Sequence, residues 1–220
     1  MAATTLTGAL YAANVPTSDV EKYSYAIGYD IGKKIGYQFD KEEIAIDTAM
    51  LVQAIEDTLN DKKQKMSLEE MNAAMQALNE AKQKHLDSQA ETNLKESRKF
   101  LAANKTKPGV VTTQSGLQYK VLTTGDGAKP TQNDKVTVHY HGTLLDGTVF
   151  DSSVDRKEPA SFGITQVIAG WQEALQLMNE GSKWQVVIPP ELAYGNRKVG
   201  AKIGPNSALV FEIELLEILK

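Results

Sequence analysis

The chain has 220 residues, of which 41% are hydrophobic and 24% charged, proportions typical of a soluble globular protein. Its formal net charge of −4 gives no reason to expect a nucleic acid or an anionic membrane as partner. The absence of cysteine excludes disulfides, thiolate zinc sites and cysteine nucleophiles. No apolar run is long enough to cross a bilayer.

The N-terminal residues 1–19 are predicted to be a flexible leader outside the fold. The small residues of GALYAAN resemble the end of a signal peptide, but no lysine or arginine precedes Lys22 and the apolar stretch is weak. The alternative is therefore the remnant of a processed signal.

A helical region is predicted before Lys107-Pro108-Gly109, where the pattern changes to short alternating runs. The first helix, over 20–37, carries isoleucines at 27, 31 and 35 beside glycines at 28, 32 and 36. Because each glycine costs a helix about 1 kcal/mol relative to alanine, this stripe indicates close approach by another helix. A second helix is predicted over 42–60.

The third helix is predicted to begin after Ser67, which forms a capping box with Glu70, and to continue to Asn104. Its first half has an apolar stripe, but residues 79–99 are polar on nearly all sides and predict a solvent-bridging rod. Two short helices and the apolar start of a third would give a single chain only a small hydrophobic core. We therefore expect a second copy to complete this core in a homodimer. The predicted domains are 20–66 for dimerisation, 67–106 for the connecting helix and 107–220.

The C-terminal part is predicted to be an α+β domain, in which several antiparallel strands are covered on one face by a single helix at 170–178. The predicted strands are Leu117–Leu122, Lys135–Leu144, Trp184–Ile188 and Ala208–Leu219.

The most polar part of this domain is a hairpin at 138–153, VHYHGTLLDGTVFDSS. Strand alternation places His139 and His141 on the polar face and Tyr140 with the core valines. The two histidines could bind a metal, but no third ligand with suitable spacing is evident. The sequence also has no nucleophile elbow, Walker loop or dinucleotide-binding motif. These exclusions favour an apolar pocket for a peptide or small molecule.

Three runs then carry a resemblance: the hairpin, VIAGWQEALQLMNEGSKW, and IPPELAYGNRKVGAKIGPNSALVFEIELL. In order and spacing they resemble the core of the FKBP-type peptidyl-prolyl cis-trans isomerases, over roughly Gly116 to Lys220. The long helix and KPGVVTTQSGLQYKVL resemble the dimeric bacterial Mip-like subgroup.

This resemblance implies a half-open antiparallel sheet wrapped around one short helix, with a pocket between them. It implies Tyr140, Asp151 and Tyr194 as catalytic residues. The substrate-binding residues implied are Phe150, Arg156, Phe162, Val167, Ile168, Trp171, Ile203 and Phe211. Trp171 would form the floor, Arg156 would hold Asp151, and the Ile168 N–H would bind a peptide carbonyl.

One tension concerns the hairpin. A two-residue Asp146-Gly147 turn would pair Thr143 with Phe150 and point Phe150 away from the pocket, so a longer loop or a bulge is needed.

The function implied is isomerisation of X-Pro bonds in polypeptide clients, without cofactor, metal or covalent intermediate. The family also implies macrolide inhibitors. The alternative is a client-binding chaperone module in which isomerisation is incidental. We expect the periplasm or cell envelope, with the cytoplasm as the alternative.

Overall fold

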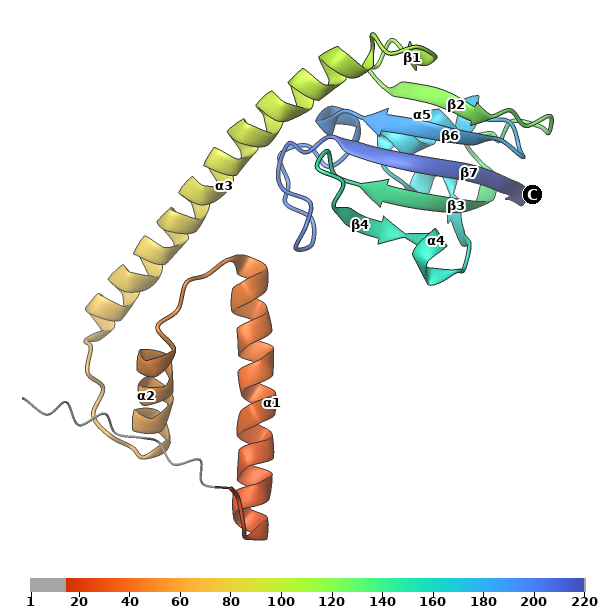
Figure 1. Ribbon diagram of the computed structural model, residues 1–220. Coiled ribbons are helices and arrows are strands. Elements are labelled where there is room, and N and C mark those ends of the chain that lie inside the picture. Colours follow the sequence, from red (N-terminus) through yellow and green to blue (C-terminus); the bar gives the residue numbers. More distant parts are fainter. Residues whose placement is uncertain (1–14, 220) are drawn as a thin grey trace, which may run out of the picture. The chain divides into compact units, whose positions relative to one another are not determined.

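The computed structural model describes residues 15–219 (Figure 1). Most of the leader expected at residues 1–19 therefore lies outside the described residues. The chain divides into two compact units, one ending at Lys63 and the other beginning at Gln64. Nowhere between residues 15 and 219 does a helix combine the length and the apolar character needed to cross a membrane.

The first unit contains two helices, α1 (Asp19–Glu42) and α2 (Thr48–Leu59). A capping box between Ser18 and Glu21 opens α1, which ends where Glu43 adopts a left-handed conformation with φ of 56°. The prediction that the second helix starts at Glu42 was wrong. It starts six residues later because Asp47 is its N-cap and accepts a hydrogen bond from the Met50 N–H.

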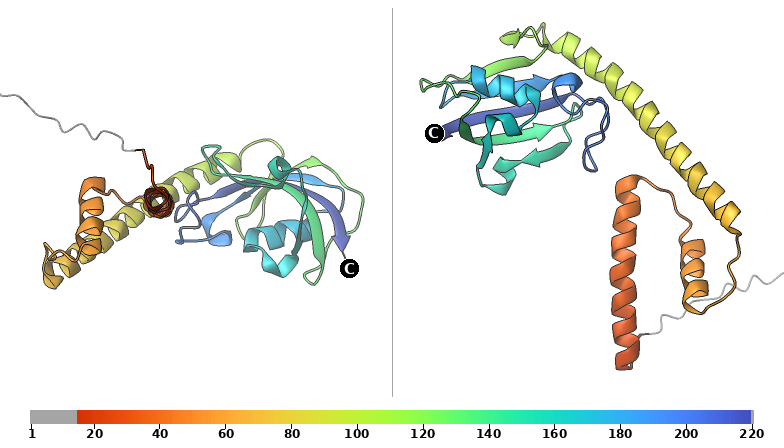
Figure 2. Two further views of the ribbon diagram at one scale, coloured as in Figure 1. Left: turned by 90° about the horizontal axis from the view of Figure 1, so that it is seen from below. Right: turned by 180° about the vertical axis from the view of Figure 1, so that it is seen from behind.

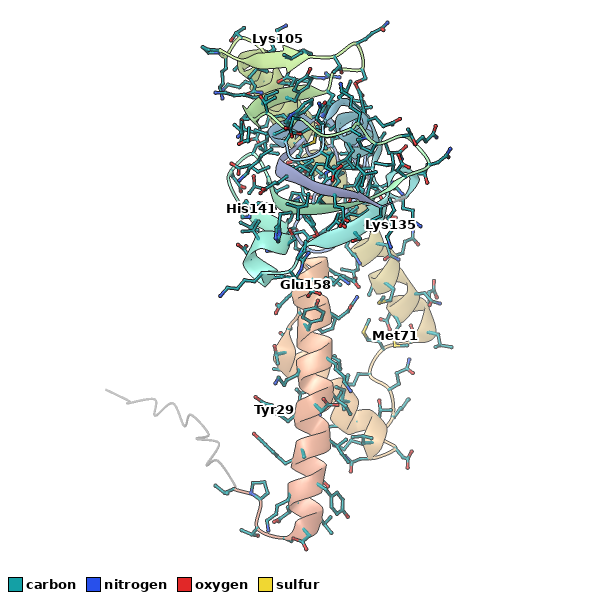
Figure 3. The ribbon with its side chains drawn as sticks, turned by 90° about the vertical axis from the view of Figure 1, so that its right-hand side faces the viewer. Tyr29, Met71, Lys105, Lys135, His141 and Glu158 are labelled. Atoms are coloured by element: carbon teal, nitrogen blue, oxygen red, sulfur yellow. The ribbon has the colours of Figure 1, made fainter. Side chains whose placement is uncertain are left out.

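The apolar side chains of α1 and α2 are not buried within one chain. Neither helix has a buried residue, and Ile27 and Tyr29 are each 58% exposed. Figure 3 shows the Tyr29 side chain on α1. A Cβ atom added at Gly28, Gly32 or Gly36 would meet nothing within 4 Å. Within the described part of the first unit, these helices therefore have no fully buried apolar face.

Helix α3 (Leu68–Asn104) opens the second unit and begins, as predicted, with a capping box between Ser67 and Glu70. In its N-terminal half the apolar stripe is largely open to solvent. Leu68 is 70% exposed and Met75 57% exposed, and Met71, labelled in Figure 3, lies on the same half.

The prediction that the polar half of α3 is a solvent-bridging rod was wrong for one face of the helix, while its other faces are largely exposed. Ala90, Ser97 and Asn104, spaced seven residues apart, are buried against the C-terminal domain. Seven residues are about two helical turns, so these side chains share one face. The contact is made by hydrogen bonds: the Asn104 amide donates to Gln118 Oε1 at 2.9 Å, and the Gln118 amide donates to the Leu101 carbonyl at 2.9 Å. The polar residues on this face of α3 therefore serve a hydrogen-bonded interface with the C-terminal domain.

The second unit also contains a single antiparallel sheet, with strand order β1-β2-β6-β7-β3-β4 and β5 paired with β3. Its strands are β1 (Val110–Thr112), β2 (Gln118–Thr123), β3 (Lys135–Thr143), β4 (Val149–Ser152), β5 (Ala160–Gly163), β6 (Lys183–Ile188) and β7 (Leu209–Leu219). The four predicted strands are confirmed as β2, β3, β6 and β7. Strand β4 is the second arm of the predicted hairpin, and the short strands β1 and β5 were not predicted.

The sheet curves around α5 (Ala169–Leu177), which lies against one of its faces (Figure 2). Trp171, Ala174 and Leu175 of α5 enter the core. The fully buried residues that meet them include Leu117, Val136, Val138, Ile164, Met178, Val186, Ile188, Leu209, Ile213 and Leu215. Three short helices complete the unit, α4 (Ser153–Arg156), η1 (Ile164–Gln166) and η2 (Pro190–Leu192). The predicted α+β fold is confirmed.

The buried amide pair makes a testable contribution to stability. We expect Asn104→Ala to destabilise the second unit by about 1–3 kcal/mol, because it leaves the Gln118 side-chain oxygen buried without its partner. Denaturant unfolding followed by circular dichroism measures the change. The matched control is Asn72→Ala, an exposed asparagine on the same helix. Equal effects of the two substitutions would contradict the proposed interface.

Candidate functional site

An open cavity of about 580 Å³ lies in the second unit, between the curved sheet and α5. Its lining residues are Tyr140, Phe150, Asp151, Phe162, Gln166, Val167, Ile168, Ala169, Trp171, Ala193, Tyr194, Arg197 and Phe211. Most of these side chains are aromatic or aliphatic, with few polar groups. A cavity of this size, lined mainly by apolar side chains with a few polar groups, is typical of a ligand-binding pocket.

The floor of the cavity is built on Trp171. Its ring meets Tyr140, Phe162 and Phe211 edge-on, with centroid distances of 5.3, 5.9 and 5.2 Å. Edge-to-face contacts of this kind stabilise aromatic pairs by about 0.5–1.5 kcal/mol beyond the area they bury. Because Trp171 is only 4% exposed, the indole is fixed by the core and presents a rigid surface.

One wall carries a hydrogen-bonded network of three polar side chains. The Tyr140 hydroxyl donates to Asp151 Oδ2 at 2.5 Å. Arg156 donates to Asp151 Oδ1 through Nη1 and to the Tyr140 oxygen through Nη2, the latter at 2.9 Å. Each oxygen of the Asp151 carboxylate thus accepts a hydrogen bond, one from Tyr140 and the other from Arg156.

The network also changes the acidity of its members. Burial alone would raise the pKa of Asp151, but the hydrogen bonds from Tyr140 and Arg156 outweigh it and hold the pKa below its ordinary value. Burial, and then the bond to Asp151, raises the pKa of the Tyr140 hydroxyl. The network therefore keeps a carboxylate anion beside a protonated phenol at neutral pH.

A bulge in the hairpin turns Phe150 into the cavity. Gly142 pairs with Asp151, but the next residue, Thr143, pairs with Val149, so Phe150 is the extra residue between them. Its ring meets Phe211 edge-on at 5.4 Å. Gly142 is required here, since a Cβ would lie 2.7 Å from the Phe211 ring and 2.8 Å from the Phe150 ring. Of the two expected alternatives, a longer loop or a bulge, the register shift shows the bulge.

Two hydrogen-bond donors at the cavity have no partner among the described residues. These are the backbone N–H of Ile168, which is the N-cap of α5, and the hydroxyl of Tyr194. Both residues line the cavity and are partly exposed. Each donor is therefore available to a bound acceptor such as a peptide carbonyl.

The two histidines of β3 lie on the sheet face opposite the core residues, as alternation predicts. His139 contacts Ser153 Oγ at 3.1 Å and His141 contacts Ser152 Oγ at 2.9 Å. Figure 3 labels His141 beside the segment that forms α4. The serines also serve the backbone, since Ser153 Oγ accepts a hydrogen bond from the Tyr140 N–H at 2.8 Å. The histidines thus support the hairpin, and neither lines the cavity.

Nine of the eleven predicted site residues line the cavity. They are Tyr140, Phe150, Asp151, Phe162, Val167, Ile168, Trp171, Tyr194 and Phe211. Arg156 reaches it through its bonds to Tyr140 and Asp151. Ile203 is a core residue, 6% exposed and bridged to Val199, so its role in binding stays a prediction.

Sequence reasoning missed four lining residues: Gln166, Ala169, Ala193 and Arg197. All four lie within three residues of a predicted site residue, and that proximity was the available signal. Arg197 is exposed, and its backbone N–H donates to the Tyr194 carbonyl at 3.3 Å.

The fold and cavity together define a class of protein: an antiparallel sheet curved around one helix, with an aromatic cavity between them. Comparison with known proteins agrees. The profile described as FKBP-type peptidyl-prolyl cis-trans isomerase matches residues 126–216, and the profile for the domain amino terminal to it matches residues 20–121.

Curated relatives match over most of the chain. The outer membrane protein MIP of Legionella longbeachae is 43% identical over 208 residues, covering 93% of this chain and 88% of its own. The FKBP-type 22 kDa peptidyl-prolyl cis-trans isomerase of Escherichia coli is 45% identical, covering 87% and 93%. The crystal structure of FkpA from Escherichia coli superposes with a TM-score of 0.66 at 36% identity, covering 93% and 98%.

The chain belongs to the FKBP-type peptidyl-prolyl cis-trans isomerases. It is an enzyme of that type, and its relatives include proteins named Mip and FkpA. These findings do not favour the alternative of a binding module with incidental isomerisation.

The lowered pKa of Asp151 has a measurable consequence. A carboxyl group with a folded-state pKa below the unfolded value, about 3.9, stabilises the fold above that pH, and the stabilisation is lost as pH falls through the folded-state pKa. NMR titration of the Asp151 carboxyl should therefore give a midpoint below 3.9. In Arg156→Gln the midpoint should rise. An unchanged midpoint in this variant would contradict the assigned cause.

Proposed function

We propose that Tyr140, Asp151 and Tyr194 are the residues that accelerate X-Pro isomerisation in this cavity. The observation that carries the proposal is the arrangement of the site: a rigid aromatic floor, a hydrogen-bonded polar wall and two free donors. The residues assigned to substrate binding are Phe150, Arg156, Phe162, Val167, Ile168, Trp171, Ile203 and Phe211.

The chemistry requires no reactive group. Rotation about a peptide bond has a barrier of about 18–20 kcal/mol, which arises from amide resonance. When the carbonyl twists out of the plane, this resonance and its charge separation are lost. A dry aromatic cavity favours the less polar twisted amide over the planar one. Interactions that are stronger in the twisted geometry lower the barrier.

Each part of the site then has a role. The proline ring rests on Trp171, and the Ile168 N–H and Tyr194 hydroxyl donate to carbonyls of the bound peptide. Arg156 holds the Asp151 carboxylate, which accepts from Tyr140, so the polar wall keeps one orientation while the amide rotates. Proline-containing polypeptides are the proposed substrates, and macrolides are expected to compete for the same cavity.

Removal of the carboxylate tests the proposed site. We expect Asp151→Ala to lower kcat/KM for a prolyl tetrapeptide about tenfold or more, since a hydrogen bond to a charged group contributes about 1.5–3 kcal/mol and 1.36 kcal/mol is tenfold in rate. The fold should persist, because the Asp151 side chain is 46% exposed. Asp155→Ala, which removes a nearby exposed carboxylate, is the control. Full activity of Asp151→Ala would refute this role.

We also propose that the protein is a homodimer formed through its N-terminal helices. The proposed dimerisation domain comprises residues 20–66, followed by the connecting helix at 67–106 and the isomerase domain at 107–220. The exposed isoleucines of α1 and the open space beside its glycines support the proposal, because an exposed apolar stripe favours a covering surface and the described residues of the first unit do not supply one. The match to the domain amino terminal to the isomerase and the likeness to FkpA also fit it.

A substitution at the glycine stripe tests the dimer. Gly32→Leu fits a single chain, since a Cβ there meets no atom within 4 Å. In a dimer packed through this stripe it should block close approach of the helices. Sedimentation at micromolar concentration should give a dimer for the natural chain and a monomer for Gly32→Leu. Lys34→Leu, on the opposite side of α1, should remain dimeric. A monomeric natural chain would refute the proposal.

Finally, we propose the periplasm or cell envelope as the location. One relative is named an outer membrane protein, and this supports the proposal. Mass spectrometry of the N-terminus of the natural protein, together with cell fractionation, provides the measurement. Recovery of the protein in the cytoplasmic fraction would contradict it.

A further inference from the structure

The loop that carries Tyr194 leaves η2 and returns to the start of β7. It is closed at its base by the Asn206 N–H, which donates to the Gly195 carbonyl at 2.8 Å. Near its tip, Val199 and Ile203 form an antiparallel bridge, and Lys202 donates to the Val149 carbonyl at 2.5 Å. The position of Tyr194 in the cavity therefore depends on how this base is held.

Helix α3 holds that base through its buried polar face. Ser97 Oγ accepts a hydrogen bond from the Ala208 N–H at 2.9 Å and donates to the Asn206 carbonyl at 3.1 Å. The Asn93 amide donates to the Pro205 carbonyl at 2.8 Å. Figure 1 shows the loop before β7 reaching α3. Ser97 is only 1% exposed, so water cannot readily replace these bonds.

The backbone of the loop lies directly against the helix. A Cβ added at Gly204 would be 2.7 Å from the Asn93 amide nitrogen and 3.1 Å from Gln89 Oε1. A side chain at position 204 would require the ends of the Asn93 and Gln89 side chains to shift. The loop backbone at Gly204 thus packs against two side chains of α3.

Asn206 is bonded both to helix α3 and to Gly195, the residue after Tyr194. Its φ of 56° lies in the left-handed region, which asparagine tolerates better than most residues but which still requires support. That support comes from Ser97 on its carbonyl, from the Ala90 carbonyl at 3.4 Å on its side-chain amide, and from Gly195 on its N–H. A substitution in α3 that removes these bonds would therefore loosen Asn206. Because the Asn206 N–H bonds the Gly195 carbonyl, the effect would extend to the residue next to Tyr194.

We propose that Ser97 and Asn93 of α3 are positioning residues of the isomerase site, acting through Asn206 on Tyr194. The inference rests on the proposed role of Tyr194. These two side chains bond the loop base and not the sheet, whereas the contact of α3 with the sheet side is made separately at Asn104 and Gln118. The connecting helix is thus a component of the enzyme's site.

A loosened loop should lower activity without unfolding the domain. When the Tyr194 hydroxyl is in place only part of the time, apparent affinity for the peptide falls in proportion to that fraction. In the full chain we expect Ser97→Ala and Asn93→Ala each to lower kcat/KM for a prolyl tetrapeptide by about three- to tenfold, mainly through KM. Arg98→Ala, which changes the adjacent exposed residue of α3, should leave it unchanged.

A double-mutant cycle separates positioning from general support. In a Tyr194→Phe background, Ser97→Ala should cost little further activity, because the hydroxyl through which it acts is absent. Additive losses would overturn the proposal. If Tyr194→Phe alone keeps full activity, the proposed role of Tyr194 fails, and the inference about α3 fails with it. Additivity, in contrast, refutes only the positioning by α3.

Amide hydrogen exchange supplies a second readout. Ser97→Ala should speed exchange of the Asn206 amide, whose acceptor on Gly195 is untouched by the substitution, and should leave the paired amides of β6 and β7 protected. Faster exchange throughout the domain would indicate a merely structural role and overturn the proposal. If Ser97→Ala does not fold, the same measurements on Asn93→Ala decide the question, since Asn93 is only partly buried.

Discussion

The edge-on contacts of Trp171 with three other rings are the feature on which both core and cavity depend. Trp171 belongs to α5, while Tyr140 and Phe211 come from the neighbouring strands β3 and β7 and Phe162 from β5. The same indole that closes the core beneath the sheet is the floor above which a proline ring is proposed to bind. An aromatic floor held in this way resists movement when a substrate arrives, and a preorganised surface is what catalysis without a reactive group requires.

The polar contacts are arranged around that floor in two layers. Asp151, Tyr140 and Arg156 form the wall of the cavity. Outside the cavity lining, Ser97 and Asn93 of α3 contact the base of the Tyr194 loop. The contacts of Ser97 and Asn93 thus connect helix α3 to the loop that carries Tyr194 into the cavity. The half of α3 that is poor in apolar residues is therefore integrated with the enzyme domain, while the more apolar half leaves Leu68 and Met75 exposed.

Much of the fold and most of the site could be predicted from the sequence. The capping box at Ser67 and the alternation of β3 and β7 were predicted correctly, because each depends only on residues close together in the sequence. The resemblance of three runs to one family supplied nine of the residues that line the cavity. The short strands β1 and β5 were missed because three or four residues carry too little periodicity. The start of α2 was misplaced because the apolar pattern was followed back to Glu42, whereas the helix begins only after its N-cap, Asp47.

The sequence by itself determined the longer elements and the outward face of the histidines, since these follow from local periodicity. Once the family resemblance assigned Phe150 to the pocket, turn chemistry also required a longer loop or a bulge. Only the tertiary structure decided where that bulge falls, at the pairing of Gly142 with Asp151 beside Thr143 with Val149. It also decided that the polar face of α3 is buried. A row of asparagine and serine has the same pattern whether it meets water or the carbonyls of a distant loop, because both satisfy its hydrogen bonds. Only the partner's position in space distinguishes the two.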